Sequence, residues 1–316
     1  MSATTQIRLR RALVAAAAAA AVLATAAPAS AATYGWPLKP FDRQHPVRAF
    51  FGDPRIVGHD AEHGTFHFGI DISARDGTPV YATLNGTAWI HPLHKDTVTV
   101  SVGGGFAHEY WHVIPAVRRG QRVVAYRTII GHVEAPWGHV HFAEVAGGVY
   151  VNPLRPAALA PYRDTTRPTI GSFGFEREGA GIGRTVRGLV DLVVEAWDDA
   201  PLAVPAPWND KLVAPALVRW RLVGPRSLAS LGRWHVAADF RGALPHVPVS
   251  AVYARWTRQN HPWGRGGRGR YRFVLARRFD TRLLADGRYR VEVAVADTHG
   301  NTTRATATFV IANRSQ

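Results

Sequence analysis

Apolar and polar residues alternate in the C-terminal half of the chain, the pattern of half-buried β-strands. Tyr289, Val291, Val293 and Val295 occupy every second position and alternate with the charged residues Arg288, Arg290 and Glu292. A turn at Asp297–Asn301 and a β-rich segment at Thr306–Ile311 complete a hairpin. Three similar runs precede it: Val186–Trp197, Ala216–Val223 and Arg270–Phe279. Together they predict a β-sandwich of the immunoglobulin or fibronectin type III kind.

The first half of the chain contains shorter β-rich runs separated by turn residues. These runs are Pro79–Ala82, Trp89–His91, Thr97–Val102, Val123–Tyr126 and His139–Val145. The dipeptide Asn85-Gly86 predicts a hairpin turn between the first two. The fold class expected for the whole chain is therefore all-β, with a mainly antiparallel first domain.

A polar segment bounded by prolines, Pro161–Pro168, has the composition of an interdomain linker. We place the division near residue 165, which gives a first domain over residues 32–163 and a second over residues 164–316. The N-terminus differs from both. Arg8, Arg10 and Arg11 precede an Ala-rich apolar run that ends before Ala29-Ser30-Ala31, which predicts a secretory signal peptide over residues 1–31, cleaved after Ala31. A membrane anchor is the alternative, disfavoured because the run is poor in Leu and Ile.

The composition and net charge limit which classes of function are possible for this chain. Of 316 residues, 47% are hydrophobic and 19% charged, as in globular proteins, and the formal net charge is +15. Removing the signal leaves +12 (35 minus 23). This charge favours binding to polyanions such as anionic wall polymers, and the export signal disfavours nucleic acid. The absence of Cys excludes disulfides, thiolate zinc sites and a cysteine nucleophile, so any metal must bind to His, Asp or Glu.

Histidine is concentrated in the first half: of 15, only His235, His246, His261 and His299 follow residue 141. His139 and His141 share one face of an extended chain, and His67 and Asp71 would too if they lay on one strand. Two imidazoles and a carboxylate can converge on one zinc ion and leave a fourth position open for water. Each pair alone is weak evidence, because such residues also occur at surfaces or as hydrogen-bonded pairs.

The order of the surrounding segments resembles the lysostaphin-type zinc endopeptidases, peptidase family twenty-three, from about Trp36 to Leu154. The segments that carry the resemblance are His67-Phe-Gly-Ile-Asp71, Gly77-Thr-Pro-Val-Tyr-Ala82, Asn85-Gly86-Thr87, Tyr110-Trp-His112, Gly120-Gln-Arg-Val123, Ile130-Gly131, His139-Val-His141-Phe142 and Val151-Asn-Pro-Leu154. The resemblance implies a cleft-bearing antiparallel β domain that hydrolyses peptide bonds in bacterial peptidoglycan.

The same resemblance implies roles for individual residues. His67, Asp71 and His141 would be the ligands of a single Zn²⁺ ion, and His112 and His139 the catalytic histidines that do not bind it. We assign His139 as general base and His112 as stabiliser of the oxyanion, and the two roles can be exchanged.

Two departures from the family pattern stand out. The loop before His139, residues 134–138, is short and carries Trp137 where the family has small residues. In the family pattern an acidic residue tends to follow the position of Phe142 directly, whereas here Ala143 separates Phe142 from Glu144. This change is expected to affect the surroundings of the metal ligands and not the ligands themselves.

Other features have weaker interpretations. A second metal site is one reading of the further histidines, and surface or groove positions are the favoured one: His59, His63, His91, His94, His108 and His132. The basic loop Gly264–Arg270, near Trp256 and Trp263, fits an anionic glycan, a teichoic-type polymer or nucleic acid, or is a solvated hairpin loop.

The sequence thus predicts a monomeric, secreted, zinc-dependent peptidoglycan endopeptidase whose β-sandwich spaces or positions it. The alternative is a non-catalytic envelope protein of the same fold that binds wall or activates another hydrolase. Because all candidate catalytic residues precede the linker, the first domain is expected to fold and cut peptides without the second.

Overall fold

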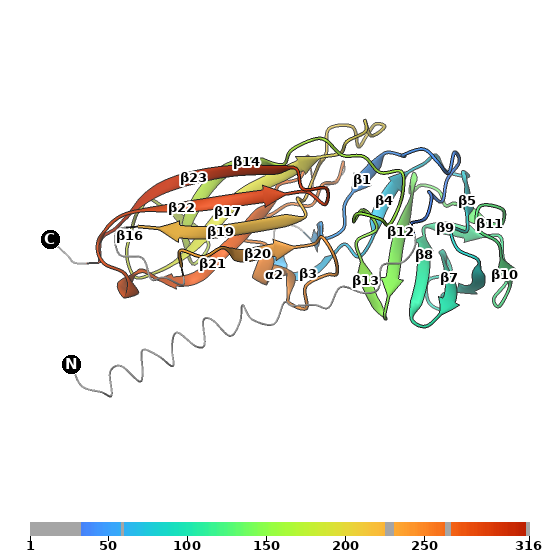
Figure 1. Ribbon diagram of the computed structural model, residues 1–316, viewed down its shortest axis with the longest axis horizontal. Helices are drawn as coiled ribbons and strands as arrows, with labels where there is room; N and C mark the ends of the chain where they lie inside the picture. Colours follow the sequence, from blue (N-terminus) through green and yellow to red (C-terminus); the bar gives the residue numbers. More distant parts are fainter. Residues whose placement is uncertain (1–32, 58–59, 225–230, 263–266, 314–316) are drawn as a thin grey trace.

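The computed structural model describes residues 33–57, 60–224, 231–262 and 267–313. The chain is almost entirely β-structure, and two groups of sheets lie side by side along its long axis (Figure 1). The expected signal segment 1–31 and part of the basic loop, residues 263–266, lie outside the described residues. Among the described residues, no helix has the length and apolar character needed to cross a bilayer.

The first group of sheets holds the residues of the resemblance. Its strands are β1 (Val47–Ala49), β2 (Pro54–Val57), β3 (Asp60–Phe66), β4 (Ile70–Ser73), β5 (Pro79–Tyr81), β6 (Gly86–Ile90), β7 (Thr97–Gly103), β8 (Phe106–Trp111), β9 (Val113–Pro115), β10 (Arg122–Val123), β11 (Ile129–Val133), β12 (His139–Ala146) and β13 (Val149–Val151). The main antiparallel sheet has the order β1-β4-β12-β8-β7-β6-β10, with β13 also paired to β12. A small sheet β5-β11-β9 and the hairpin β2-β3 flank it.

The second group consists of two five-stranded sheets, β15-β14-β17-β18 with β21 on β17, and β16-β23-β22-β19-β20. Its elements are β14 (Thr169–Arg177), β15 (Ala180–Ile182), β16 (Thr185–Val186), β17 (Leu189–Asp199), β18 (Leu212–Val213), β19 (Leu217–Val223), β20 (His235–Asp239), α2 (Val249–Val252), β21 (Arg272–Asp280), the 3-10 helix η1 (Thr281–Leu283), β22 (Gly287–Ala296) and β23 (Thr302–Ile311). Only the short β16–β23 pairing is parallel among those described. The all-β, antiparallel fold class is confirmed, and the immunoglobulin-like or fibronectin-like topology stays a prediction.

The alternation in the second half of the sequence produces a core between these two sheets. Tyr289, Val291 and Val293 on β22 are each at most 1% exposed, while the charged residues between them face outward or are half-buried. Phe309 on β23 meets Phe175 on β14 of the opposite sheet, with ring centroids 4.8 Å apart. Each such side chain contributes ~1.5–3 kcal/mol through burial, so the period-two pattern fixes which face of each strand turns inward.

One predicted turn is wrong. Asn85-Gly86 does not close a hairpin, because β5 pairs with β11 in the small sheet whereas β6 pairs with β7 and β10 in the main sheet. The dipeptide instead forms a corner between two sheets, where Asn85 Oδ1 accepts a hydrogen bond from Ala125 N. The run Val123–Tyr126 is also shorter than expected, because the chain turns after Val123 and Tyr126 has a positive φ of 60°.

The two groups share one continuous hydrophobic core. Phe66, at the end of β3, packs on Phe240 and Tyr253 of the second group, with centroid distances of 5.5 and 6.2 Å. The β2-β3 hairpin thereby lies against α2, as Figure 1 shows. The hydroxyl of Tyr253 also donates to the carbonyl of Gly52 at 2.8 Å.

Buried hydrogen bonds join the same surfaces. Ala214 N donates to Asp53 Oδ1 at 2.7 Å, and Asn152 Nδ2 donates to the carbonyl of Phe240 at 2.8 Å. Asp53 is fully buried, so loss of a donor would leave a carboxylate oxygen unsatisfied, which costs ~1–3 kcal/mol. Part of the core and of the polar pairing of the first group therefore comes from the second group, and independent folding of the first domain stays a prediction.

A glycine at this junction allows a test of the shared core. Gly52 has a φ of +90°, and an added Cβ would overlap the ring of Phe240. Gly77 has a similar φ of +78°, with nothing within 4 Å of an added Cβ. Both alanine variants incur the positive-φ cost of ~1–3 kcal/mol, and overpacking adds ~1–3 kcal/mol only in Gly52→Ala. We expect urea unfolding of the full chain to show a larger loss for Gly52→Ala, and equal losses would contradict a tight junction.

Candidate metal centre

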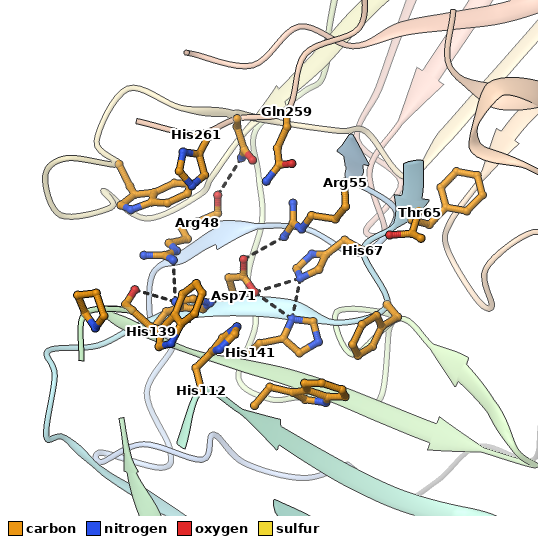
Figure 2. Close-up of a pocket in the computed structure, with 17 residues that line it drawn as sticks. Arg48, Arg55, Thr65, His67, Asp71, His112, His139, His141, Gln259 and His261 are labelled. Carbon is orange, nitrogen blue, oxygen red and sulfur yellow. Dashed lines mark hydrogen bonds and ion pairs between the residues drawn. The ribbon is translucent and has the colours of Figure 1, made fainter. Parts of the chain in front are cut away.

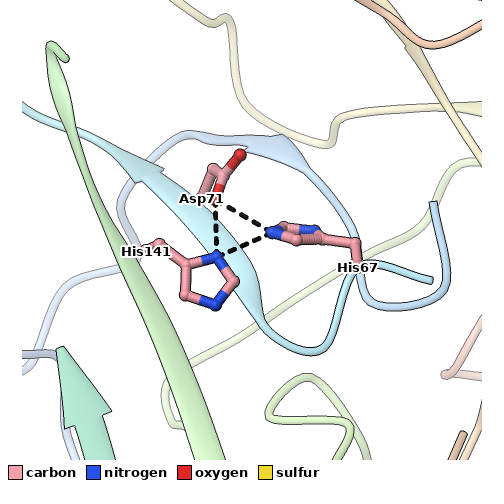
Figure 3. A group of neighbouring side chains, drawn as sticks. All are labelled: His67, Asp71 and His141. Atoms are coloured by element: carbon pink, nitrogen blue, oxygen red, sulfur yellow. Dashed lines mark hydrogen bonds and ion pairs between the residues drawn. The ribbon is translucent and has the colours of Figure 1, made fainter. Parts of the chain in front are cut away.

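Strand pairing places two of the candidate ligands directly opposite each other. In the antiparallel pair β4–β12, Asp71 is the register partner of His141, so their side chains leave the same face of the sheet. His67 is not on a strand with Asp71, as the spacing argument supposed. It lies in the connection between β3 and β4, and that connection folds back over the sheet. Figure 3 shows the three side chains pointing into a common space.

The three candidate ligand atoms are closely clustered and shielded from solvent. His67 Nε2 lies 3.0 Å from Asp71 Oδ1 and 2.7 Å from His141 Nδ1, and His141 Nδ1 lies 3.0 Å from Asp71 Oδ1. The three residues are 3–6% exposed. The predicted set is therefore brought together as one buried group that can hold a metal ion.

The hydrogen bonds around this group indicate that it fits a cation. His67 Nδ1 donates to the carbonyl of Phe50 at 2.8 Å, so in the neutral ring Nε2 carries a lone pair. That lone pair faces the carboxylate oxygen of Asp71 and the Nδ1 atom of His141. A proton on one ring cannot bridge all three atoms, whereas a divalent ion with nitrogen and oxygen ligands satisfies them together.

Electrostatics favour the protonation states that metal binding requires. Burial, with the positive charge of Arg55, lowers the pKa of His67 to about 3, and burial lowers the pKa of His141. Burial opposes ionisation of Asp71, but the neighbouring His67, His139 and Arg55 outweigh it and hold the pKa of Asp71 well below 3.8. At neutral pH the group is therefore two neutral imidazoles and one carboxylate.

Two neighbours fix the position of the group. Arg55 Nη2 donates to Asp71 Oδ2 at 3.0 Å, which leaves Oδ1 directed at the histidines. An added Cβ at Gly69 would overlap the carbonyl of Phe142 and the ring of His141. Gly69 therefore permits the connection that carries His67 to approach β12 closely.

His139 lies next to the ligand group but is held by other partners. Its Nε2 atom is 3.5 Å from Asp71 Oδ1, while its Nδ1 atom lies 2.6 Å from Arg48 Nη2 and 2.8 Å from the carbonyl of Trp137. Arg48 occupies a β-bulge, because Val47 pairs with Ile72 and Ala49 pairs with Asp71. The bulge turns this buried arginine toward the site.

His112 lies across from His139, and the two ring centroids are 4.8 Å apart. It follows β8 directly and has a φ of 62°, an uncommon conformation for a non-glycine residue. Its Nδ1 atom is 3.3 Å from Asp96 Oδ2, and its ring stacks on Trp137 at 4.1 Å. Burial, together with His139, lowers the pKa of His112 to about 4, so its ring is neutral at pH 7.

These residues line a cavity of about 740 Å³ that both groups of sheets enclose. The second group contributes Trp208, Gln259, Asn260 and His261, and Figure 2 shows His261 and Gln259 across the cavity from His141. The guanidinium of Arg48 lies 3.9 Å from the ring of Trp208, and Asn260 Nδ2 donates to the Arg48 carbonyl at 3.0 Å. The second group therefore forms a wall of the site and supports a residue that contacts His139.

Sequence reasoning missed this wall and both arginines. Arg48 and Arg55 lie in short strands that no alternation marks, and Trp208 and Asn260 lie in loops of the other domain. No local pattern distinguishes them from surface residues, because their partners lie elsewhere in the sequence. Arg55 and Asp71 are 16 residues apart, and Asn260 and Arg48 are 212 residues apart.

The opposite face of the main sheet carries Glu144 on β12 and His108 on β8, which are register partners. Glu144 is fully buried and accepts hydrogen bonds from Arg155 and Tyr34. Glu144 lies one residue later than the acid of the family pattern. Its side chain therefore points to the face away from the ligands, because successive side chains on a strand alternate between faces. His108, expected at a surface or groove, is also fully buried and contacts Thr83 Oγ1 at 2.6 Å.

The remaining features have ordinary partners where they are described. The rings of His91 and His94 lie 4.7 Å apart in a tilted arrangement near Trp111. His59 lies outside the described residues, and none of the other five further histidines joins a metal-binding group in the part of the chain that the structure describes. In the basic loop, Arg270 pairs with Glu195 at 2.9 Å, and Arg268 donates to the Asp210 carbonyl. Part of the loop's charge is therefore neutralised or engaged locally.

Residues 65–153 match the family model described as Peptidase family M23. The match contains all five candidate histidine and aspartate residues. Uncharacterized proteins of Mycobacterium tuberculosis (strain H37Rv) and Mycobacterium bovis are each 32% identical over 157 residues, covering 44% of this chain and 57% of the relative. The chain thus spans little more than half the length of these curated relatives.

Two of the similar solved structures are described as peptidases. A zinc-containing peptidase from Vibrio cholerae is 22% identical, with a TM-score of 0.34 and coverage of 41% of each chain. Pseudoalterin, an M23 metalloprotease from the deep sea, is 17% identical, with a TM-score of 0.30 and coverage of 48% of this chain and 94% of its own.

Proposed function

We propose that this chain, whose residues 65–153 form a Peptidase family M23 domain, is a secreted zinc-dependent endopeptidase that hydrolyses peptide bonds of bacterial peptidoglycan, in stem peptides or cross-bridges. The observation that supports this most is the buried group of His67, Asp71 and His141 at the side of a cavity with two further histidines. Secretion is inferred from the signal-like residues 1–31.

His67 Nε2, Asp71 Oδ1 and His141 Nδ1 would hold one zinc ion, and the neutral imidazoles and ionised carboxylate fit it. When bound, zinc polarises the scissile carbonyl and activates water for attack. The chain's own residues then have to orient the peptide, take up a proton and stabilise the developing oxyanion.

The contacts of the two free histidines favour an exchange of the roles that the sequence analysis assigned. Nδ1 of His139 faces a donor, Arg48 Nη2 at 2.6 Å, and an acceptor, the Trp137 carbonyl at 2.8 Å. The guanidinium is the closer and charged partner and presents only donors, so it favours Nδ1 as the acceptor and the proton on Nε2. His139 is thereby set up to donate a hydrogen bond to an oxyanion. The Asp96 carboxylate, 3.3 Å from His112 Nδ1 without hydrogen-bond geometry, acts through its charge and favours a proton on that atom and a lone pair on Nε2. We therefore infer that His112 is the general base.

The cavity suits an extended peptide substrate. Trp111, Trp137 and Trp208 supply apolar surface from both groups of sheets, and Arg48 and Arg55 supply positive charge. Trp137 is 45% exposed, so the indole that replaces the small residues of the family borders the opening and would contact the peptide. The charge of +12 without the signal would attract the protein to anionic wall.

The deciding experiment is product analysis. The chain from residue 32, loaded with one equivalent of zinc, is incubated with purified cross-linked peptidoglycan, and the released fragments are identified by mass spectrometry. We expect fragments with a new amino and a new carboxyl end at one type of peptide bond, with intact glycan. His246→Ala, which removes an exposed histidine far along the chain, is the matched control and should release the same fragments.

Two outcomes would contradict the proposal. Fragments produced by glycan cleavage would place the activity in another class. Zinc-loaded protein that sediments with the wall but releases no peptide would favour the non-catalytic envelope protein.

A further inference from the structure

A second group of acidic side chains lies outside the lining of the proposed active site. Asp164 belongs to the segment that links the two groups of sheets, Asp198 to β17 and Asp297 to the turn after β22. One carboxylate oxygen from each residue lies within 4.8 Å of the others. The three residues are 6%, 1% and 4% exposed, so the cluster is shielded from bulk solvent.

Among the described residues, no cationic side chain balances this cluster. None of the three carboxylates forms an ion pair with a described Lys, Arg or His. Two other buried carboxylates do have such partners, since Glu144 pairs with Arg155 and Glu176 pairs with Arg272. The buried Asp53 instead accepts from two backbone N–H groups, one on each oxygen. Three buried like charges without a counter-charge are strongly unfavourable.

One oxygen in the cluster also lacks a hydrogen bond. Asp164 Oδ1 accepts from Thr166, and Asp297 Oδ1 accepts from the backbone of His299 and Asn301. Asp198 Oδ1 accepts from Asp199 N, but the buried Asp198 Oδ2 has no partner in the described part of the chain. Burial and the neighbouring carboxylates raise the pKa of Asp198 to about 8. An orphan oxygen beside two other carboxylates indicates that something positive belongs there.

We propose that Asp164, Asp198 and Asp297 form a calcium site that ties the linker to both sheets of the second group. Hard carboxylate oxygens bind Ca²⁺ or Mg²⁺, whereas zinc prefers nitrogen and sulfur. Mg²⁺ demands a near-ideal octahedron, whereas Ca²⁺ accepts about six to eight oxygen ligands in flexible geometry, so three carboxylates carried by a linker, a strand and a turn favour Ca²⁺. This inference is independent of the proposed peptidase function.

The position of the site gives it a structural role. β17 lies in one sheet of the second group and β22 in the other, and the linker residue Asp164 completes the cluster. The Asn301 side chain, next to Asp297, also donates to the carbonyl of Asp164 at 3.0 Å. A bound ion would therefore tie the linker, through Asp164, to both sheets of the second group.

Calcium chloride titration tests this. The chain from residue 32 is freed of metal with a chelator, given back one equivalent of zinc and titrated in a calorimeter. We expect one Ca²⁺ per chain with a Kd below ~1 mM and a rise in Tm of about 5 °C or more at saturation. Equal concentrations of magnesium chloride should change Tm little.

Matched variants locate the ion. Asp198→Asn keeps the size and the acceptor for Asp199 N, and it should lose calcium binding while retaining zinc. Asp199→Asn alters the exposed neighbour and should retain both metals.

The competing explanation is that the three carboxyl groups share protons. It predicts a wild-type Tm that does not respond to calcium, with Asp198→Asn more stable than wild type at pH 8, and this pattern would overturn the proposal. Wild-type protein that binds no calcium, or Asp198→Asn that binds it as well as wild type, would also overturn it. If Asp198→Asn does not fold, the wild-type titration decides.

Discussion

Replacing Asp71 by alanine is expected to reduce the zinc content from one equivalent to none and to abolish measurable peptide hydrolysis. The carboxylate is the charged member of the candidate ligand group and lies 3.0 Å from both imidazole nitrogens. Without it, two neutral imidazoles remain, too few ligands to retain zinc through dialysis. Elemental analysis after dialysis, with turnover on a soluble wall peptide, measures both effects.

Asp42→Ala is the control, since it removes an exposed carboxylate from the same domain and should keep zinc and activity. Unfolding in urea shows whether Asp71→Ala remains folded. Full zinc occupancy in a folded Asp71→Ala protein would refute the ligand assignment for that residue. The same measurement on His67→Ala and His141→Ala extends the test to the whole group.

The sequence was sufficient for the candidate ligands but not for the geometry that unites them. His139 and His141 share a face of β12 as their spacing predicts, because that segment is a strand. Even spacing along one strand does not explain why His67 lies beside Asp71, since His67 lies in the connection between β3 and β4, and the role of both residues as ligands stays a prediction. The opposition of Asp71 and His141 depends on the β4–β12 register, which links residues 70 apart and has no local signal.

Local sequence patterns could not predict the residues that connect the site to the second group of sheets. Arg48 faces His139 because a bulge adds one residue to β1, and alternation alone does not indicate where a bulge occurs. Trp208 and Asn260 complete the site from loops whose packing depends on the shared core. The linker composition at residues 161–168 indicated a boundary, but it carried no information on how tightly the two sides would pack.

Replacing His112 by alanine should reduce turnover by ~10²–10⁴-fold with zinc retained, because a proton acceptor is lost. His139→Ala should cost ~10²–10³-fold, as expected for a lost oxyanion donor. Neither side chain belongs to the candidate ligand group, so elemental analysis should give one zinc per chain in both variants. Loss of zinc from either variant would mean that a ligand has been mistaken for a catalytic group.

Glutamine at each position separates the two roles. An amide N–H can donate to an oxyanion but cannot accept a proton at neutral pH, so His139→Gln should recover at least about 10-fold over His139→Ala, whereas His112→Gln should match His112→Ala. The reverse pattern would assign the base to His139. It would then follow that Nδ1 of His139 donates to the Trp137 carbonyl despite the guanidinium of Arg48 2.6 Å away, and that Asp96 only positions His112.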